Sequence, residues 1–170
     1  MLRVFNKADI LPECQHGFLK GKSVATQLIE YLDILTDNYE HKKFTDVIYF
    51  DFEKAFDSVG HNLLLEKLQK AGKTGKFLEW IKSFLCDRTA RVCVNKAFSP
   101  SFDIPAGVPQ GSVLGPILFI FYISDLPKEC ETAEVFSHLF ADDLKAASSS
   151  SEHLQLFINK LHEWCRRLLG

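Results

Sequence analysis

The chain has 170 residues, of which 46% are hydrophobic and 25% are charged. This composition is typical of a soluble globular protein with a single core. The formal net charge of −2 gives no overall basic signal for nucleic acid, although it leaves room for a local basic channel. The longest apolar run, Pro116–Ile123, is too short to cross a membrane, and no secretory signal is visible. Five scattered cysteines without a CxxC pair argue against a zinc site, so we expect a soluble intracellular protein with reduced thiols.

The first half of the chain is expected to contain three helices and one strand. Apolar residues recur at helical spacing over Ser23–Lys42, and the sequence then becomes β-branched and aromatic over Phe44–Phe52. This predicted strand closes on an acid, Asp51. Two short helices are predicted over His61–Ala71 and Lys76–Cys86, the first of them stopped by a glycine.

The middle of the chain combines short strands with a shaped loop. Alternating residues over Ala90–Asn95 predict a strand that pairs with Ser101–Ile104 across a connecting loop. The stretch Pro105–Pro116 is dense in glycine and proline, so it must form a loop of defined shape. A helix is expected from Pro116, because proline is well tolerated in the first turn of a helix.

The last third of the chain is predicted to form a hairpin followed by a helix. Glu134–Ala141 and Leu144–Ala147 are the expected strands, and Ser149 with Glu152 fits a capping box at the start of the helix. That helix is expected to place one apolar side inward, formed by Leu154, Phe157, Ile158, Leu161, Cys165 and Leu168. Because helices and strands mix without regular alternation, the pattern favours an α+β fold with a small antiparallel sheet backed by helices.

Two adjacent aspartates, Asp142 and Asp143, lie in the apolar stretch "LFADDLKAA". Neighbours on a strand point to opposite faces, so both carboxylates project together only at the tip of a hairpin. An isolated pair of this kind is usually an ordinary turn. Here, however, Asp51 also ends a strand, and two adjacent strands would bring three carboxylates to one edge of a sheet. Clustered carboxylates repel one another unless cations neutralise them, which predicts a site for Mg²⁺ or Mn²⁺.

Three segments occur in the order "YFDFEKAFDSVGH", "GVPQGSVLGPILF" and "LFADDLKAA". They resemble successive palm motifs of reverse transcriptases, and the closest resemblance is to the enzymes of non-LTR (LINE-type) retrotransposons. "QHGFLKGKSVATQL" resembles the fingers motif of this family, and "LQLFINKLHEWCRRLLG" resembles the beginning of the next palm motif. The resemblance covers nearly the whole chain and implies an RNA-directed DNA polymerase that transfers nucleotides by two-metal-ion catalysis.

The resemblance implies which residues hold the metal ions. Asp51 and Asp142 would be the principal ligands of two Mg²⁺ or Mn²⁺ ions, and Asp143 would complete the catalytic triad. The carbonyl of Phe52 would be an additional ligand. Asp57 lies outside the triad, and we interpret it as a structural residue.

The resemblance also implies contacts with the nucleotide and the primer. Phe56 matches the bulky residue that crowds a ribose 2′-hydroxyl, although an aromatic residue of the core is an equally good interpretation of this position. Gln110 would lie against the incoming nucleotide or the template base, and Gly111 would allow close backbone approach there. Phe140 and Ala141 would flank the end of the primer.

Two lysines of the fingers motif, Lys20 and Lys22, would contact the nucleotide triphosphate, although lysines of this kind are commonly solvated surface residues. Leu19 stands where the family usually has an arginine, so either a lysine substitutes or triphosphate binding is weaker. The same stretch, Gly17–Ser23, ends like a phosphate-binding P-loop. It has three residues between its glycines where that motif requires four, and no strand precedes it.

The expected organisation is a single reverse transcriptase domain fragment. Residues up to about 43 would belong to the fingers, and residues from about 44 to 170 mostly to the palm, ending before the primer grip and thumb. The implied partners are an RNA template, a DNA primer, deoxynucleotide triphosphates and the remaining fingers, thumb and endonuclease regions of a longer polyprotein, with no membrane. A nuclear location follows from the resemblance alone. The alternative is a degenerate or domesticated retrotransposon fragment that acts at most as a nucleic-acid-binding module.

Overall fold

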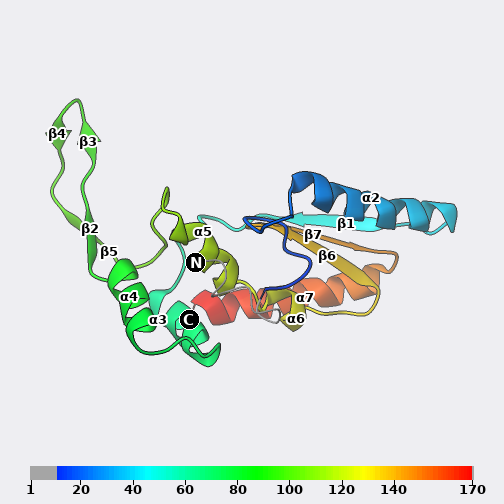
Figure 1. Ribbon diagram of the computed structural model, residues 1–170. Coiled ribbons are helices and arrows are strands. Elements are labelled where there is room, and N and C mark those ends of the chain that lie inside the picture. The colour runs from blue at the N-terminus through cyan, green and yellow to red at the C-terminus, as the bar shows by residue number, and fades with distance from the viewer. Residues whose placement is uncertain (1–10, 170) are drawn as a thin grey trace. The chain divides into compact units, whose positions relative to one another are not determined.

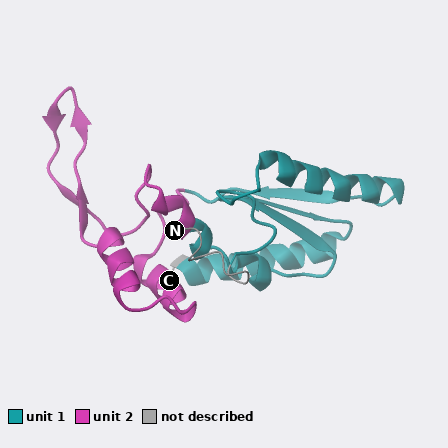
Figure 2. Cartoon of the chain, viewed as in Figure 1, with its two compact units in different colours: residues 1–53, 119–170 teal, residues 54–118 magenta. Residues whose placement is uncertain are grey.

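The computed structural model describes residues 11–169, which fold into two compact units (Figure 2). The first unit is built from residues 1–53 and 119–170, and the second from residues 54–118. Helix α5 (Leu114–Tyr122) begins in the second unit and ends in the first. Each unit is described separately below.

The first unit is organised around a three-stranded antiparallel sheet in the order β1-β7-β6 (Figure 1). Its strands are β1 (Asp46–Phe50), β6 (Val135–Phe140) and β7 (Asp143–Ser148). β6 and β7 pair up to the contact between Phe140 and Asp143, so their connecting turn contains only two residues. The last residue of β1, the last residue of β6 and the first residue of β7 therefore lie at the same end of the sheet.

Helices cover both faces of this sheet. On one face, Phe157 of α7 (Ser151–Leu169) packs against Phe50 of β1, with ring centroids 6.2 Å apart. On the other face, Tyr31 of α2 (Val24–Glu40) meets His138 of β6 edge-on. The short helix α6 (Leu126–Glu129) packs on α7. The buried apolar residues of this unit include Leu126, Leu139, Leu144, Ala146, Leu154, Phe157, Leu161 and Trp164.

The second unit is a helix pair with two short β-ribbons. Helices α3 (His61–Lys70) and α4 (Lys76–Leu85) pack through leucine and isoleucine side chains that are fully buried, namely Leu64, Leu68, Ile81 and Leu85. One ribbon pairs β2 (Arg88–Ala90) with β5 (Phe102–Ile104). The other pairs β3 (Cys93–Val94) with β4 (Ala97–Phe98).

The predicted α+β fold is confirmed, as are the helix after Ser23, the helices of the second unit and the hairpin around Asp142. The predicted continuous strand over Ala90–Asn95 is wrong, because Arg91 and Val92 interrupt it. Ala90 does pair with Phe102 of the predicted partner segment, whereas Cys93 and Val94 belong to a separate ribbon. Val92 is 54% exposed, so the alternation in this stretch does not mark a buried face.

Two helix starts and the buried side of one helix also differ from expectation. α5 begins at Leu114, which places Pro116 at its third residue, still within the first turn. The cap of α7 is Ser150, whose Oγ accepts a hydrogen bond from His153 N–H at 3.3 Å, so the predicted capping role of Ser149 is wrong by one residue. The helix also buries Trp164, which the predicted apolar side omitted.

Candidate active site

The three candidate carboxylates lie at one end of the first unit's sheet. Asp51 directly follows β1, Asp142 lies in the turn between β6 and β7, and Asp143 is the first residue of β7. β1 and β7 are neighbours, with Phe50 paired to Leu144, so the sheet itself brings these positions together. The sequence prediction that the strands would collect the acids at one edge agrees with this arrangement.

The electrostatics of Asp142 show that the three acids interact. Burial raises the pKa of the Asp142 carboxyl above its usual value, a backbone hydrogen bond partly opposes this rise, and the negative charges of Asp143 and Asp51 add to it. An ionised Asp142 is therefore destabilised both by lost hydration and by its two neighbours. A positive charge placed among the three side chains would relieve this repulsion.

The donor set suits a hard divalent cation, because carboxylate oxygens are the ligands that Mg²⁺ and Mn²⁺ prefer. Within residues 11–169, no three His, Cys, Asp or Glu side chains are already drawn together into a finished coordination cluster. The chemistry of Asp51, Asp142 and Asp143 and their mutual repulsion support a cation site, and their side chains would have to move to complete it.

A pocket of about 330 Å³ lies beside these acids in the first unit. Lys145 lies in it, with its Nζ 5.4 Å from the centroid of the Tyr31 ring and 5.9 Å from that of Tyr49. Gln27 is buried, and among the described residues its Nε2 has no hydrogen-bond partner. The pocket thus combines acidic and hydrogen-bond-donating groups; it is lined by Val24, Gln27, Tyr49, Phe50, Asp51, Phe140, Asp143, Leu144 and Lys145.

The residues expected to flank the primer lie in the same turn. Phe140 lines the pocket beside Asp51 and Asp143, whereas Ala141 is buried and has a φ of 55°. Phe52 is half-buried and its ring packs edge-on against Trp164, which fixes the backbone directly after Asp51. The roles of Phe140, Ala141 and the Phe52 carbonyl stay predictions.

The two lysines of the fingers motif lie in the turn before α2. Lys20 is exposed, whereas Lys22 is half-buried and donates a hydrogen bond to the carbonyl of Glu13. The first turn of α2 is capped internally, because the Ser23 side chain accepts from Thr26 N–H and the Thr26 side chain accepts from Ser23 N–H. This closed cap agrees with the sequence argument against a P-loop.

The remaining candidate residues belong to the second unit, where a glycine-rich loop is fixed to the segment after Lys54. Gly107 N–H donates to the Val59 carbonyl and Val108 N–H donates to the Phe56 carbonyl, both at 2.9 Å. Gly107 has a φ of 88°, and a Cβ there would lie 2.8 Å from Asp57 Cα and O. Only glycine fits this close approach without strain.

Gln110 is held in place by Asp57. The Gln110 Nε2 donates a hydrogen bond to Asp57 Oδ1 at 2.8 Å, which agrees with the interpretation of Asp57 as a structural residue. Gly111 has a φ of 78°, and no other part of the described chain lies within 4 Å of the place where its Cβ would be. The face of this loop next to Gln110 is therefore open to a ligand.

Sequence reasoning missed the residues that support this loop. His61 is buried, and its Nε2 lies 2.8 Å from the Gly107 carbonyl, which also accepts a hydrogen bond from the Arg88 guanidinium at 2.5 Å. It also missed Gln15, a buried amide that contacts Ala141. Neither contact had a signal in the local sequence, because each joins segments far apart in the chain.

Comparisons with known proteins identify the class. The family model described as reverse transcriptase (RNA-dependent DNA polymerase) matches residues 1–169. The chain belongs to this family. In the part of the chain that the structure describes, no helix has both the length and the apolar character needed to traverse a lipid bilayer.

The curated relatives that this chain resembles include enzymes of retrotransposons. The chain is 31% identical over 177 residues to a probable RNA-directed DNA polymerase from transposon BS of Drosophila melanogaster, covering 96% of this chain and 19% of the relative. It is 32% identical over 165 residues to the RNA-directed DNA polymerase from mobile element jockey of the same species, covering 91% and 18%. The predicted non-LTR resemblance is confirmed. The chain spans about a fifth of the length of these relatives.

Solved structures share the fold. Telomerase from Candida tropicalis in complex with a fragment of telomeric RNA superposes with a TM-score of 0.71 at 19% identity, covering 94% of this chain and 29% of that one. Apo telomerase from the same species gives a TM-score of 0.69 at 20% identity, covering 94% and 34%. These likenesses establish the fold alone.

Proposed function

We propose that this chain carries the fingers and palm part of an RNA-directed DNA polymerase, and that Asp51, Asp142 and Asp143 form its catalytic centre. The observation that carries the proposal is the convergence of these three carboxylates at one end of the sheet, where the charges of Asp51 and Asp143 add to the raised pKa of Asp142. Divalent cations would relieve the repulsion within such a cluster, and the bound cations would in turn attract the phosphates of a nucleotide.

The reaction is nucleotidyl transfer from a deoxynucleotide triphosphate. The 3′-hydroxyl oxygen of a DNA primer forms a bond to the α-phosphorus, the bond from that phosphorus to the bridging oxygen breaks, pyrophosphate leaves and the hydroxyl proton passes to solvent. Two Mg²⁺ or Mn²⁺ ions, when bound, would lower the pKa of the hydroxyl and neutralise the departing charge. Asp51 and Asp142 would hold these ions on rigid strand ends, and Asp143 and the Phe52 carbonyl would complete the set.

The nucleotide would be selected by the second unit and oriented by the fingers lysines. Gln110, fixed by Asp57, presents its side chain at the open face of the loop beside Gly111. Phe56 would exclude the ribose 2′-hydroxyl by its bulk, and Lys20 and Lys22 would attract the triphosphate. The RNA template, DNA primer, polyprotein partners and nuclear location implied by the family are part of this proposal.

The test is addition of a single deoxynucleotide to a hairpin whose DNA 3′ end is paired on an RNA template strand. Joining primer to template in one molecule raises their effective concentration and reduces the need for other regions to hold the duplex. The chain should extend this hairpin only with Mg²⁺ or Mn²⁺. Asp142→Asn should lower the rate by at least about a hundredfold, because loss of a ligand should cost no less than loss of a residue that only supports a ligand.

Asp46→Asn is the matched control, because Asp46 is the first residue of the strand that Asp51 directly follows, and its carboxylate accepts a hydrogen bond from the Ser151 hydroxyl. It should keep the wild-type rate. Extension that persists in Asp142→Asn would contradict the assignment of the catalytic centre. Absence of extension in the wild-type chain, together with retained hairpin binding, would favour a nucleic-acid-binding module over a polymerase.

A further inference from the structure

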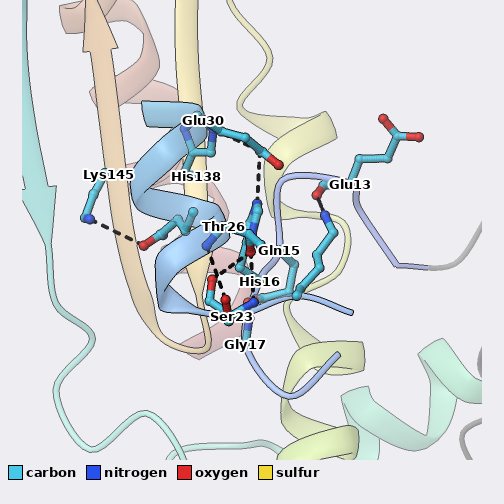
Figure 3. A network of polar contacts seen from close by, with 11 residues as sticks. Glu13, Gln15, His16, Gly17, Ser23, Thr26, Glu30, His138 and Lys145 are labelled. Carbon is cyan, nitrogen blue, oxygen red and sulfur yellow. Dashed lines mark hydrogen bonds and ion pairs between the residues drawn. The ribbon is translucent and has the colours of Figure 1, made fainter. Parts of the chain in front are cut away.

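We propose that Gln15 is a positioning residue, which sets the orientation of the turn that carries Asp142 and Asp143. This inference rests on the proposed function of that turn. Gln15 lies 126 residues away from Ala141 in the sequence, yet its side chain holds both backbone polar groups of that residue. Figure 3 shows Gln15 within the polar network that joins its segment to α2.

The Gln15 amide is matched group by group to the turn. Its Nε2 donates to the Ala141 carbonyl at 3.1 Å, and its Oε1 accepts from the Ala141 N–H at 2.9 Å and from Gly17 N–H at 2.7 Å. Gln15 is 1% exposed, so these hydrogen bonds are shielded from water and breaking them would leave buried polar groups unpaired. Among amide-sized side chains, only one that both donates and accepts can satisfy this set.

Ala141 needs this support because of its backbone conformation. Its φ of 55° is left-handed, a conformation that is unfavourable for a residue with a Cβ. Ala141 directly precedes Asp142, so a rotation of its peptide would redirect both aspartates of the turn. Gln15 fixes the N–H and the C=O on either side of this residue and thereby fixes the direction in which the carboxylates leave the hairpin.

The segment that carries Gln15 is itself anchored to the hairpin. His16 N–H donates to the Leu139 carbonyl at 2.8 Å, and Leu139 N–H donates to the Cys14 carbonyl at 2.9 Å. The His16 ring lies between Thr26 and Glu30 of α2, with its Nδ1 2.9 Å from Thr26 Oγ1 and its Nε2 3.1 Å from Glu30 Oε2. The segment that carries Gln15 is therefore held by the hairpin on one side and by α2 on the other, through contacts that do not involve the Gln15 side chain.

The backbone of Gly17 also lies close to Ala141, independently of the Gln15 side chain. A Cβ at Gly17 would lie 2.3 Å from Ala141 N, a backbone atom that can move only if the turn moves. Gly17→Ala should therefore displace the turn by steric pressure, whereas Gln15→Leu should release it by removing its hydrogen bonds. Two substitutions of different kinds would then produce the same defect.

The experiment compares wild type, Gln15→Leu, Gln15→Glu and Gly17→Ala with the control Asn38→Leu. Asn38 is another buried amide of the first unit, whose Nδ2 donates to Thr45 Oγ1 at 2.9 Å, away from the turn. Amide hydrogen exchange is measured over the hairpin, and the Mg²⁺ concentration for half-maximal extension is measured together with the rate at saturating metal.

Gln15→Leu and Gly17→Ala should speed exchange of the hairpin amides selectively and raise the half-maximal Mg²⁺ concentration by at least about tenfold, as loss of a supporting contact at a metal site typically does. Gln15→Glu keeps the acceptor and should be intermediate. Asn38→Leu should change neither quantity in the hairpin.

The inference would be overturned if amide hydrogen exchange in the hairpin of Gln15→Leu were as slow as in the control Asn38→Leu. An unchanged half-maximal Mg²⁺ concentration in Gln15→Leu would also overturn it. If the wild-type chain extends no primer, the proposed function fails, and the exchange data alone then decide whether Gln15 holds the turn.

Discussion

At the scale of single residues, Asp142 is the acid of the candidate site whose carboxyl pKa is raised by burial and by neighbouring charges. It is half-buried in a two-residue turn, next to one acid in sequence and another on the adjacent strand. Sequence could predict the placement of these acids at one edge of the sheet, because strand ends and adjacent acids are local patterns. It could not predict Gln15, because nothing near Gln15 indicates that its amide meets Ala141.

The stability of the metal-free chain should reflect the raised pKa of Asp142. Its folded pKa lies above the usual value of 3.8, so the folded state binds the proton more tightly than the unfolded state. The free energy of unfolding should therefore fall as pH rises through the window that begins near 3.8 and ends at the folded pKa. Asp142→Asn should remove this fall.

The measurement is urea denaturation of wild type and Asp142→Asn at several pH values without divalent metal. Near neutral pH, the variant should be more stable than wild type, and this advantage should disappear below the pKa window. Equal pH dependence of the two proteins would show that the carboxylates do not destabilise one another. Saturating Mn²⁺ should reverse the order, because the cation stabilises only the protein with the intact acid.

At the scale of elements, the best-predicted parts are those with a strong local period. α2 and the β6–β7 hairpin were predicted because their apolar residues follow a helix or strand pattern over several turns or residues. The β3–β4 ribbon was missed because its turn, Asn95–Lys96, has φ values of 49° and 68° without a glycine. A lysine in a left-handed conformation gives no turn signal in the sequence.

The glycine-rich loop of the second unit offers a stability test at this scale. A left-handed conformation costs a residue with a Cβ about 1–2 kcal/mol. Gly107→Ala should lower the free energy of unfolding by more than this, because its Cβ would also lie 2.8 Å from the Asp57 backbone. Gly72→Ala is the matched control, since Gly72 has a φ of 76° but open space around it.

The free energy of unfolding of both variants is measured by denaturant titration. The difference between them isolates the steric contact with Asp57 from the backbone cost that they share. Equal destabilisation would mean that the loop yields at Gly107 and does not hold Gln110 firmly against Asp57.

At the scale of the whole molecule, the two units carry the two groups of residues to which we propose polymerase roles. The first unit supplies the carboxylates and the pocket beside them, and the second supplies Phe56, Gln110 and Gly111. The motifs predicted both groups of residues. The motifs do not predict where the chain divides into two units, because the second unit lies between two parts of the first in sequence. The boundary near residue 43 between fingers and palm stays a prediction.

The central claim is that Asp51 and Asp142 share a divalent cation, and direct binding of Mn²⁺ tests it without requiring any other region of a polymerase. Electron paramagnetic resonance titration would compare wild type, Asp51→Asn, Asp142→Asn, the double variant and the control Asp46→Asn.

The account predicts that each single variant at the site weakens Mn²⁺ binding by at least about tenfold, as loss of a contact at a metal centre does. The double variant should lose less than the sum of the two single losses, because both residues serve one site. Wild-type affinity in Asp51→Asn and Asp142→Asn, or a loss equal to theirs in Asp46→Asn, would contradict a shared metal site.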